Sequence, residues 1–365
     1  MNVPIAATGL SHGARAHPEH AAVAVRRALE RAGWSRAQSV LLFLTPHYAR
    51  HPEAAIRAAA RAAGSLQVYG ATGAGILTEQ EWLLDAPGAA AMVFSAPLLP
   101  ASMQPGEPLL SLSTPAGLTS DWLDAPPARI GAVSGDLFGQ GPFQVWAGAR
   151  VAETGRVEAG WPDMEWAIRA SQGVRALTAP IEVGEVAGLD LLRLGNYPAL
   201  NVLVQALPVG VREMERIPLH LIMGGVTFGD PLTAIREGRY RLNHIVATHV
   251  ATQSITLSQP LQPGERLFWA MRDILTAERD MRVAIDAAAD ALSGTPGFGL
   301  LFPCMGRGPH FFGNRDRDLE LVQARLPGLP VLGMYGNGEI GPLQDENHLY
   351  QYSTVLGLFR ARTAC

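Results

Sequence analysis

Two stretches of the chain show the same succession of apolar and polar positions. Each begins with an apolar strand pattern, LLFLTP at 41–46 and LLFP at 300–303. A helical stretch follows, and then comes an apolar segment with closely spaced glycines. Gly70, Gly73 and Gly75 in the first stretch have the same spacing as Gly333, Gly336 and Gly338 in the second. We interpret the two stretches as copies of one unit, which differ by a short loop insertion.

The flanking patterns extend this match in both directions. In each copy the pattern predicts a first strand, a long helix, a second helix between the motifs and a closing strand. In the first copy these are Ile5–Leu10, Pro18–Ala32, Glu53–Ala63 and Ala91–Ala96. In the second they are Arg266–Met271, Leu275–Leu292, Asp316–Leu326 with Asn314 as its N-cap, and Thr354–Phe359. Helical spacing of Met281, Ile285, Ala288 and Leu292 predicts one buried stripe on the long helix.

The region between the copies, about 100–262, is rich in short strand patterns and turn residues. Phe143–Val151 and Arg156–Trp161 flank a turn at 153–155 and predict a hairpin. The predicted fold class is therefore α/β. It has two related halves, each a β-α-β-α-β-β unit with a mixed sheet packed against helices, and a β-rich middle section. We expect the domain boundary near residue 160.

Composition narrows the chemistry that is available to this chain of 365 residues. All 29 basic residues are arginine, which excludes mechanisms that need a phosphate-binding, kinase or Schiff-base lysine. Two cysteines do not make a disulfide framework. The net charge of −4 is spread along the chain, so we expect no nucleic acid partner. Without a signal-peptide pattern or a long apolar run, we expect a cytoplasmic protein with no membrane partner.

The glycine motifs and the residues after the LLFP strand are the candidate ligand site. Closely spaced glycines let a ligand approach the backbone, although tight turns at strand ends explain them equally well. The candidates are Gly70, Thr72, Gly73, Cys304, Gly306, Arg307, Asn337 and Glu339. Arg307 could clamp a carboxylate, and Glu339 with Asn337 could hold an amine. The structural alternative is that Arg307 and Glu339 pair with each other.

Three further residues have both a functional and a structural interpretation. Cys304 could act as the nucleophile of a hydrolase, with His310 nearby in sequence, but a single cysteine is typical of a buried apolar position. Arg272 ends a strand beside Asp273, which suits a helix N-cap. His47 could be an axial haem ligand, although a surface histidine is the more ordinary interpretation. We expect binding rather than catalysis, and no metal site.

At the level of whole motifs, the chain resembles the FIST family (F-box and intracellular signal transduction) of sensory domains, with N-terminal and C-terminal parts. The N-terminal resemblance is carried by LLFLTPHY, VYGATGAGIL and the later Glu81. The C-terminal resemblance is carried by SQGVRAL, LGNYPALNVL, PGERLFWAMRD, LLFPCMGRG and VLGMYGNGEIGP. The chain departs from the pattern at Ala71, where cysteine is frequent in the family. The resemblance divides the chain into residues 1–160 and 161–365.

The resemblance implies a domain that senses a small molecule, with amino-acid-like ligands proposed for the family. It also implies a separate signalling partner, such as a histidine kinase, because no output module is recognisable in this sequence. One branch of the family resembles nitric-oxide sensors of the NosP type, which bind haem. A haem sensor and a cysteine-dependent hydrolase are therefore the alternatives to a small-ligand sensor.

Overall fold

The computed structural model describes residues 4–100 and 107–362, which form two compact units. Unit 1 combines the chain up to Ser171 with the chain from Met281 onward, and unit 2 is Gln172–Asp280. The boundaries between these units, after Ser171 and after Asp280, differ from the single boundary predicted near residue 160. The two-part family division describes sequence motifs rather than packing and stays a prediction.

Unit 1 contains three six-stranded sheets. The N-sheet has the order β1 (Ala6–His12), β6 (Gly88–Phe94), β2 (Ser39–Leu44), β3 (Val68–Thr72), β10 (Val145–Ala147), β11 (Arg150–Val151). The C-sheet has the order β13 (Met164–Ser171), β26 (Thr354–Ala361), β22 (Phe298–Pro303), β23 (Val331–Tyr335), β4 (Gly75–Thr78), β5 (Trp82–Leu84). The middle sheet has the order β7 (Leu99–Pro100), β12 (Arg156–Gly160), β8 (Leu109–Ser113), β9 (Arg129–Val133), β24 (Glu339–Leu343), β25 (Glu346–Tyr350).

The three sheets share one plan. Each is built on one parallel pair, β2–β3, β8–β9 or β22–β23, and its other pairings are antiparallel. After each parallel pair the chain crosses to another sheet: β4 pairs with β23, β24 pairs with β9, and β10 pairs with β3. This cyclic exchange of strands ties the three sheets together. The predicted pair of halves is therefore not confirmed. Both copies lie in unit 1, together with a further copy of the same plan that forms the middle sheet.

A glycine stands at the same register position in each parallel pair. Gly70 lies opposite Leu42, Gly131 opposite Ser111 and Gly333 opposite Leu301. A Cβ atom added to these glycines would lie 1.7, 1.8 and 1.8 Å from the facing carbonyl oxygens. No side chain fits at that distance, so the close approach of the two backbones requires glycine.

The inner core of unit 1 is shared by all three sheets. It includes Phe43, Leu112 and Phe302, which follow the register residues of β2, β8 and β22. The rings of Phe43 and Phe302 meet edge to face with their centroids 5.9 Å apart. Each sheet is therefore held by apolar side chains on its inner face, which lose their contact with water together.

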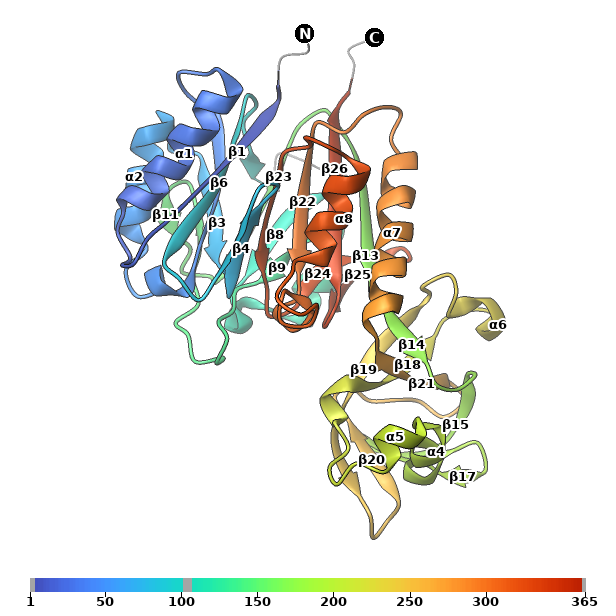
Figure 1. Cartoon of the computed structure of the whole chain (residues 1–365). Helices are drawn as coiled ribbons and strands as arrows, with labels where there is room; N and C mark the ends of the chain where they lie inside the picture. Colours follow the sequence, from blue (N-terminus) through green and yellow to red (C-terminus); the bar gives the residue numbers. More distant parts are fainter. Residues whose placement is uncertain (1–3, 101–106, 363–365) are drawn as a thin grey trace. The chain divides into compact units, whose positions relative to one another are not determined.

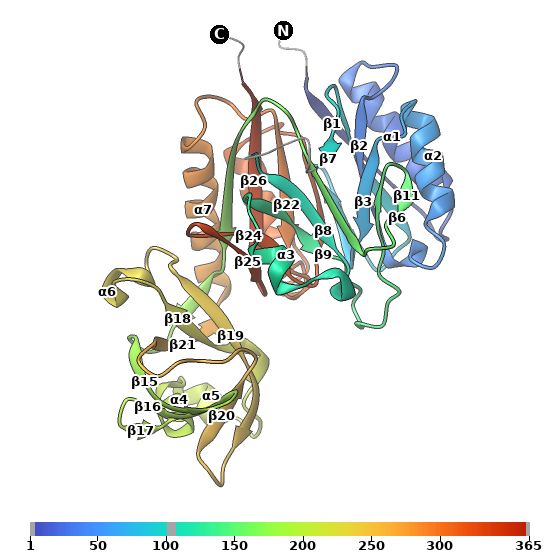
Figure 2. The ribbon, with the colours of Figure 1, turned by 180° about the vertical axis from the view of Figure 1, so that it is seen from behind.

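Helices cover the outer faces of two of the sheets (Figure 1). Helices α1 (Glu19–Ala32) and α2 (Glu53–Ala63) pack on the N-sheet through an apolar cluster that includes Ala24, Ala28 and Ile56. Helices α7 (Ile274–Asp290) and α8 (Arg317–Arg325) pack on the C-sheet. The predicted stripe Met281, Ile285, Ala288, Leu292 is buried there. Figure 2 shows α3 (Ser120–Asp124) near β25 of the middle sheet.

Unit 2 is a separate β structure with its own apolar core. Its elements are β14 (Val174–Ala176), β15 (Ile181–Ala187), β16 (Asp190–Leu194), β17 (Tyr197–Pro198), α4 (Ala199–Ala206), α5 (Val209–Arg212), β18 (Ile222–Thr227), α6 (Pro231–Ala234), β19 (Tyr240–His249), β20 (Ser254–Leu257) and β21 (Arg266–Arg272). The strand order runs from β21 through β15, β16, β20 and β19 to β18, which pairs back with β21. Because this order closes on itself, the core, which includes Leu191, Ile255 and Trp269, lies inside a ring of strands.

Three local predictions are wrong. The strand 266–271 does not begin the second copy: β21 belongs to unit 2, and β13 holds the outer place in the C-sheet that β1 holds in the N-sheet. The predicted hairpin does not form, since β11 pairs with β10 while β12 pairs with β8 and β7. The N-cap of α8 is Asp316 rather than Asn314, because the Asp316 carboxylate accepts the amide hydrogen of Leu319.

Candidate functional site

The ends of β22 and β23 bring together five of the residues predicted from sequence. Cys304 directly follows β22, and residues 336–338 lead from β23 into β24, which begins at Glu339. Backbone bonds join these segments: the Gly336 amide donates to Pro303 at 3.0 Å, and the Met305 amide donates to Gly336 at 3.0 Å. Cys304, Gly306, Arg307, Asn337 and Glu339 therefore lie at one end of the C-sheet.

The first glycine motif lies directly against the second. The Ala74 amide donates to the Tyr335 carbonyl at 2.9 Å, and a Cβ atom on Gly73 would lie 2.9 Å from Cβ of Met334. Thr72 faces the middle sheet, because its hydroxyl oxygen lies 2.8 Å from that of Ser134, which follows β9. Gly70 and Thr72 are buried in β3, and Ala71, the departure from the family pattern, is buried in the inner core. These positions are packed within protein.

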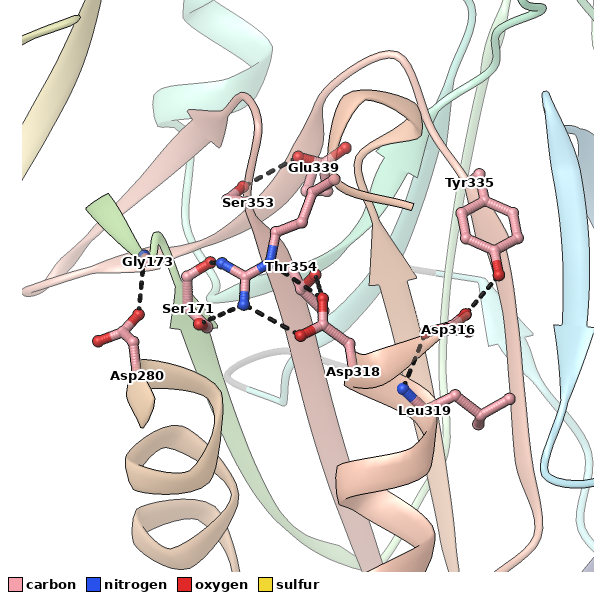
Figure 3. Close-up of polar contacts among 11 residues, drawn as sticks. Ser171, Gly173, Asp280, Asp316, Asp318, Leu319, Tyr335, Glu339, Ser353 and Thr354 are labelled. Atoms are coloured by element: carbon pink, nitrogen blue, oxygen red, sulfur yellow. Dashed lines mark hydrogen bonds and ion pairs between the residues drawn. The ribbon is translucent and has the colours of Figure 1, made fainter. Parts of the chain in front are cut away.

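Arg307 is fully enclosed, with 1% of its surface exposed, and its charge is met by a buried carboxylate (Figure 3). Nε and Nη2 donate to the two carboxylate oxygens of Asp318, each at 3.0 Å. The guanidinium group also donates to the carbonyl and hydroxyl oxygens of Ser171, both at 2.8 Å. Thr354 donates its hydroxyl to Asp318 at 2.6 Å. The guanidinium group is thus occupied by protein groups instead of being open to a ligand carboxylate, and its ion-pair partner is Asp318 rather than Glu339.

Glu339 is the buried carboxyl group whose partners are incomplete. It has no exposed surface, and burial raises its pKa well above the usual value. The Ser353 hydroxyl donates to Oε2 at 2.9 Å, and Ser353, Cys304, the Gly338 amide and the charge of Arg307 oppose the rise. Within residues 4–100 and 107–362, Oε1 finds no hydrogen-bond partner. A buried polar atom without a partner is costly, which marks this carboxyl group as a functional candidate.

Asp316 is a second perturbed carboxyl group at the start of α8. It caps the helix through the Leu319 amide at 2.9 Å and accepts the Tyr335 hydroxyl. Burial, and then the neighbouring charge of Asp318, raise its pKa to about 6. Sequence reasoning missed Asp316, Asp318, Ser171 and Thr354 as site residues. The two aspartates of the NRDRD sequence at 314–318 were the available signal.

The other predicted residues come from different segments of the chain. His47 is exposed in the short helix Pro46–Tyr48, and its Nδ1 lies 3.3 Å from the Thr45 hydroxyl. An exposed ring fits an axial haem ligand poorly, because such ligands normally lie inside a pocket. Arg272 belongs to unit 2, at the end of β21 opposite Val174. His310, the possible base for Cys304, is exposed, whereas Cys304 is buried.

Outside the gaps at 1–3, 101–106 and 363–365, no group of three or more His, Cys, Asp or Glu side chains is arranged to hold a metal ion. Over the same residues, none of the helices combines the length and the apolar character needed to cross a membrane.

Comparison with known families identifies a match to part of this chain. Residues 198–342 match the family model described as the FIST C domain. The match supports a FIST-domain protein. The matched segment runs from the start of α4 in unit 2 into β24 of unit 1, and it includes Cys304, Arg307 and Glu339. The sequence-based resemblance is thus confirmed for the C-terminal part of the FIST pattern.

The chain is also similar to curated mycobacterial proteins. The uncharacterized protein Mb0898c of Mycobacterium bovis is 30% identical over 233 residues, which is 64% of this chain and 60% of that protein. The uncharacterized protein Rv0628c of Mycobacterium tuberculosis is 29% identical over 230 residues, which is 63% of this chain and 60% of that protein. The chain therefore spans about 60% of the length of these relatives.

Proposed function

We propose that this protein is a sensory signal-transduction protein whose small ligand carries an amino group and binds at Glu339. The FIST C domain supports the sensory class. The observation that carries the ligand proposal is the unpartnered Oε1 atom of Glu339, which is buried beside Cys304 and Ser353. A ligand that donated a hydrogen bond to this oxygen would remove the cost of leaving it unpaired.

The state of Glu339 specifies which ligand chemistry gains most. Because burial raises its pKa well above the usual value, the carboxyl group favours its neutral form in the free protein. An ammonium group within hydrogen-bond distance would lower that pKa and leave a charge-assisted pair, which is stronger than a neutral hydrogen bond. Binding of an amine would thus release a proton. This chemistry favours amino acids and related amines over neutral or anionic metabolites.

Access to Glu339 would pass two side chains that reach solvent. Asn337 is exposed and lies two residues before Glu339. Tyr352 is half-buried and adjoins Ser353, and its ring would be 2.5 Å from a Cβ atom on Gly306. The ring therefore packs directly on the glycine, and we propose that the ligand enters when Tyr352 moves away from Gly306. A signalling protein that recognises this rearrangement would be the output partner.

Calorimetric titration tests the site with glycine, L-leucine, L-glutamate and L-arginine as probes. We expect at least one probe to bind the wild type, with an enthalpy that changes between phosphate and Tris buffers because a proton is released. The variant Glu339→Gln keeps the size of the side chain and one acceptor oxygen but cannot ionise, so binding should weaken about tenfold or more. Glu346→Gln makes the same change at an exposed position of β25 and should leave affinity unchanged. Equal affinity of wild type and Glu339→Gln would refute the proposal.

A further inference from the structure

A concave site lies on unit 1, away from the Glu339 cluster. A cavity of about 750 Å³ opens between the C-terminal half of α2 and the β10–β11 hairpin. It is lined by Arg57, Ala60, Arg61, Gly64, Ser65, Leu66, Ala147, Gly148, Ala149 and Arg150. Its volume falls within the range of ~300–1,000 Å³ that is typical of small-molecule sites. These residues lie outside the segment that matches the FIST C domain.

Three arginines line this cavity. Arg57 and Arg61 are one helical turn apart on α2, so they share a face of that helix, and Arg150 comes from β11 across the cavity. In the described part of the chain none of the three forms an ion pair with an acidic side chain, and the lining contains no Asp or Glu. A fourth arginine, Arg36, packs close by, since a Cβ atom on Gly64 would lie 3.4 Å from its Cβ.

The ordinary roles of surface arginines do not account for this arrangement. A cation in the last turn of α2 complements the helix macrodipole, which explains Arg61 alone. Arg57 lies further back along the helix, and Arg150 belongs to a different element. Bringing three like charges together without acidic partners costs electrostatic free energy, which a bound anion would recover. The exposed Leu66 side chain and three alanines add an apolar wall beside the charges.

We propose that this cavity binds a small molecule that carries a phosphate group. A charge near +3 matches a phosphate monoester or a diphosphate better than a single carboxylate, and guanidinium groups bind phosphate oxygens in pairs of parallel hydrogen bonds. Gly148 leaves room for the group to approach the backbone, because no atom lies within 4 Å of a Cβ atom added there. The apolar wall would contact the organic part of the ligand. This site is independent of the one proposed at Glu339.

Titration calorimetry of the full chain with inorganic pyrophosphate tests the site directly. We expect the wild type to bind, and the variants Arg61→Gln and Arg150→Gln to bind about tenfold more weakly each. Arg50→Gln is the matched control, because Arg50 is exposed, precedes α2 and does not line the cavity. It should bind like the wild type. Melting temperatures of all variants should agree within a few degrees, because these side chains are exposed.

Three outcomes would overturn the proposal. Pyrophosphate that binds Arg61→Gln and Arg150→Gln as tightly as the wild type would place the anion elsewhere. An equal loss of affinity in Arg50→Gln would mean that net charge, rather than a built site, attracts it. Citrate binding as tightly as pyrophosphate would replace the phosphate assignment with a carboxylate one. A nucleoside diphosphate, titrated in place of pyrophosphate, should bind more tightly because the apolar wall contacts its organic part.

Discussion

Individual buried charges at the end of the C-sheet are stabilised by a small set of polar side chains. Arg307 and Asp318 form a two-point ion pair, and the hydroxyls of Ser171 and Thr354 complete it. Removing charges from water costs several kcal/mol per ion, so such a pair persists only when its hydrogen bonds are complete. Glu339 stands apart because its Oε1 lacks a partner in the described residues. The contrast separates a structural pair from a candidate ligand group.

Asp316 leads to a prediction about pH and stability. Its folded pKa of about 6 lies above the unperturbed value of 3.8, so the native state binds more protons than the unfolded state between these values. The free energy of unfolding should therefore fall as pH rises through this window, by a contribution on the order of 2 kcal/mol between pH 4.5 and 7.5. Urea unfolding of wild type and Asp316→Asn at pH 4.5 and 7.5 measures it. The variant keeps the cap and should lose this part of the slope.

Glu339 contributes equally to the pH dependence of both proteins in that measurement. Its pKa is also raised, so it adds a slope of the same sign to both proteins and does not affect their difference. If wild type and Asp316→Asn lose the same free energy between the two pH values, the perturbed carboxyl group is not Asp316.

At the scale of elements, a parallel strand pair with an obligatory glycine is the recurring piece. The first strand of each pair leads into a short helix, Pro46–Tyr48, Pro115–Gly117 or Met305–Arg307. The glycine strand then continues the ladder, because the amides of Gly73, Ser134 and Gly336 donate to Leu44, Ser113 and Pro303. The copy in the middle sheet differs from the other two because its helix, α3, has only five residues.

Substitution of the register glycine tests this explanation. Gly333→Ala would place a methyl group 1.8 Å from the carbonyl oxygen of Leu301, so the strands must separate. We expect a loss of about 3 kcal/mol or more in the free energy of unfolding. Gly210→Ala is the control, because no atom lies within 4 Å of its added Cβ atom, and alanine suits helix α5. Urea unfolding should show no loss for Gly210→Ala, and a comparable loss in both variants would contradict the explanation.

On the scale of the whole molecule, unit 2 is inserted into the copy of the repeated plan that forms the C-sheet. It follows β13 and ends within α7, where unit 1 resumes. The two ends of unit 2 are joined, since the Gly173 amide donates to the Asp280 carboxylate at 3.0 Å (Figure 3). Adjacent ends are typical of inserted domains, which interrupt a host fold without pulling it apart.

This organisation predicts that residues 172–280 fold alone. The closed strand order and the separate core of unit 2 do not depend on side chains from unit 1. The isolated fragment should show a cooperative melting transition and dispersed amide resonances. A disordered spectrum would mean that the ring of strands needs unit 1 to form, and that the insertion is not an independent domain.

The amino-acid sequence by itself determined the local structure of this protein. Periodic apolar residues placed α1, α2, α7 and α8, and the two glycine motifs marked strands whose backbones approach too closely for a side chain. It also brought Cys304, Arg307 and Glu339 to one strand end, because adjacent parallel strands end at the same edge of a sheet. These features depend on neighbours along the chain or on one strand pairing.

Only the tertiary structure decided which strands pair and which charges meet. An apolar pattern requires that a face be buried but does not specify against what, so the crossing of β4, β10 and β24 into other sheets was not predictable. The copy that forms the middle sheet was not predicted because its helix, α3, is short. Arg307 could have paired with Glu339 or with a ligand, but folding placed Asp318 and Ser171 around it. Such partners depend on long-range packing, which local patterns do not record.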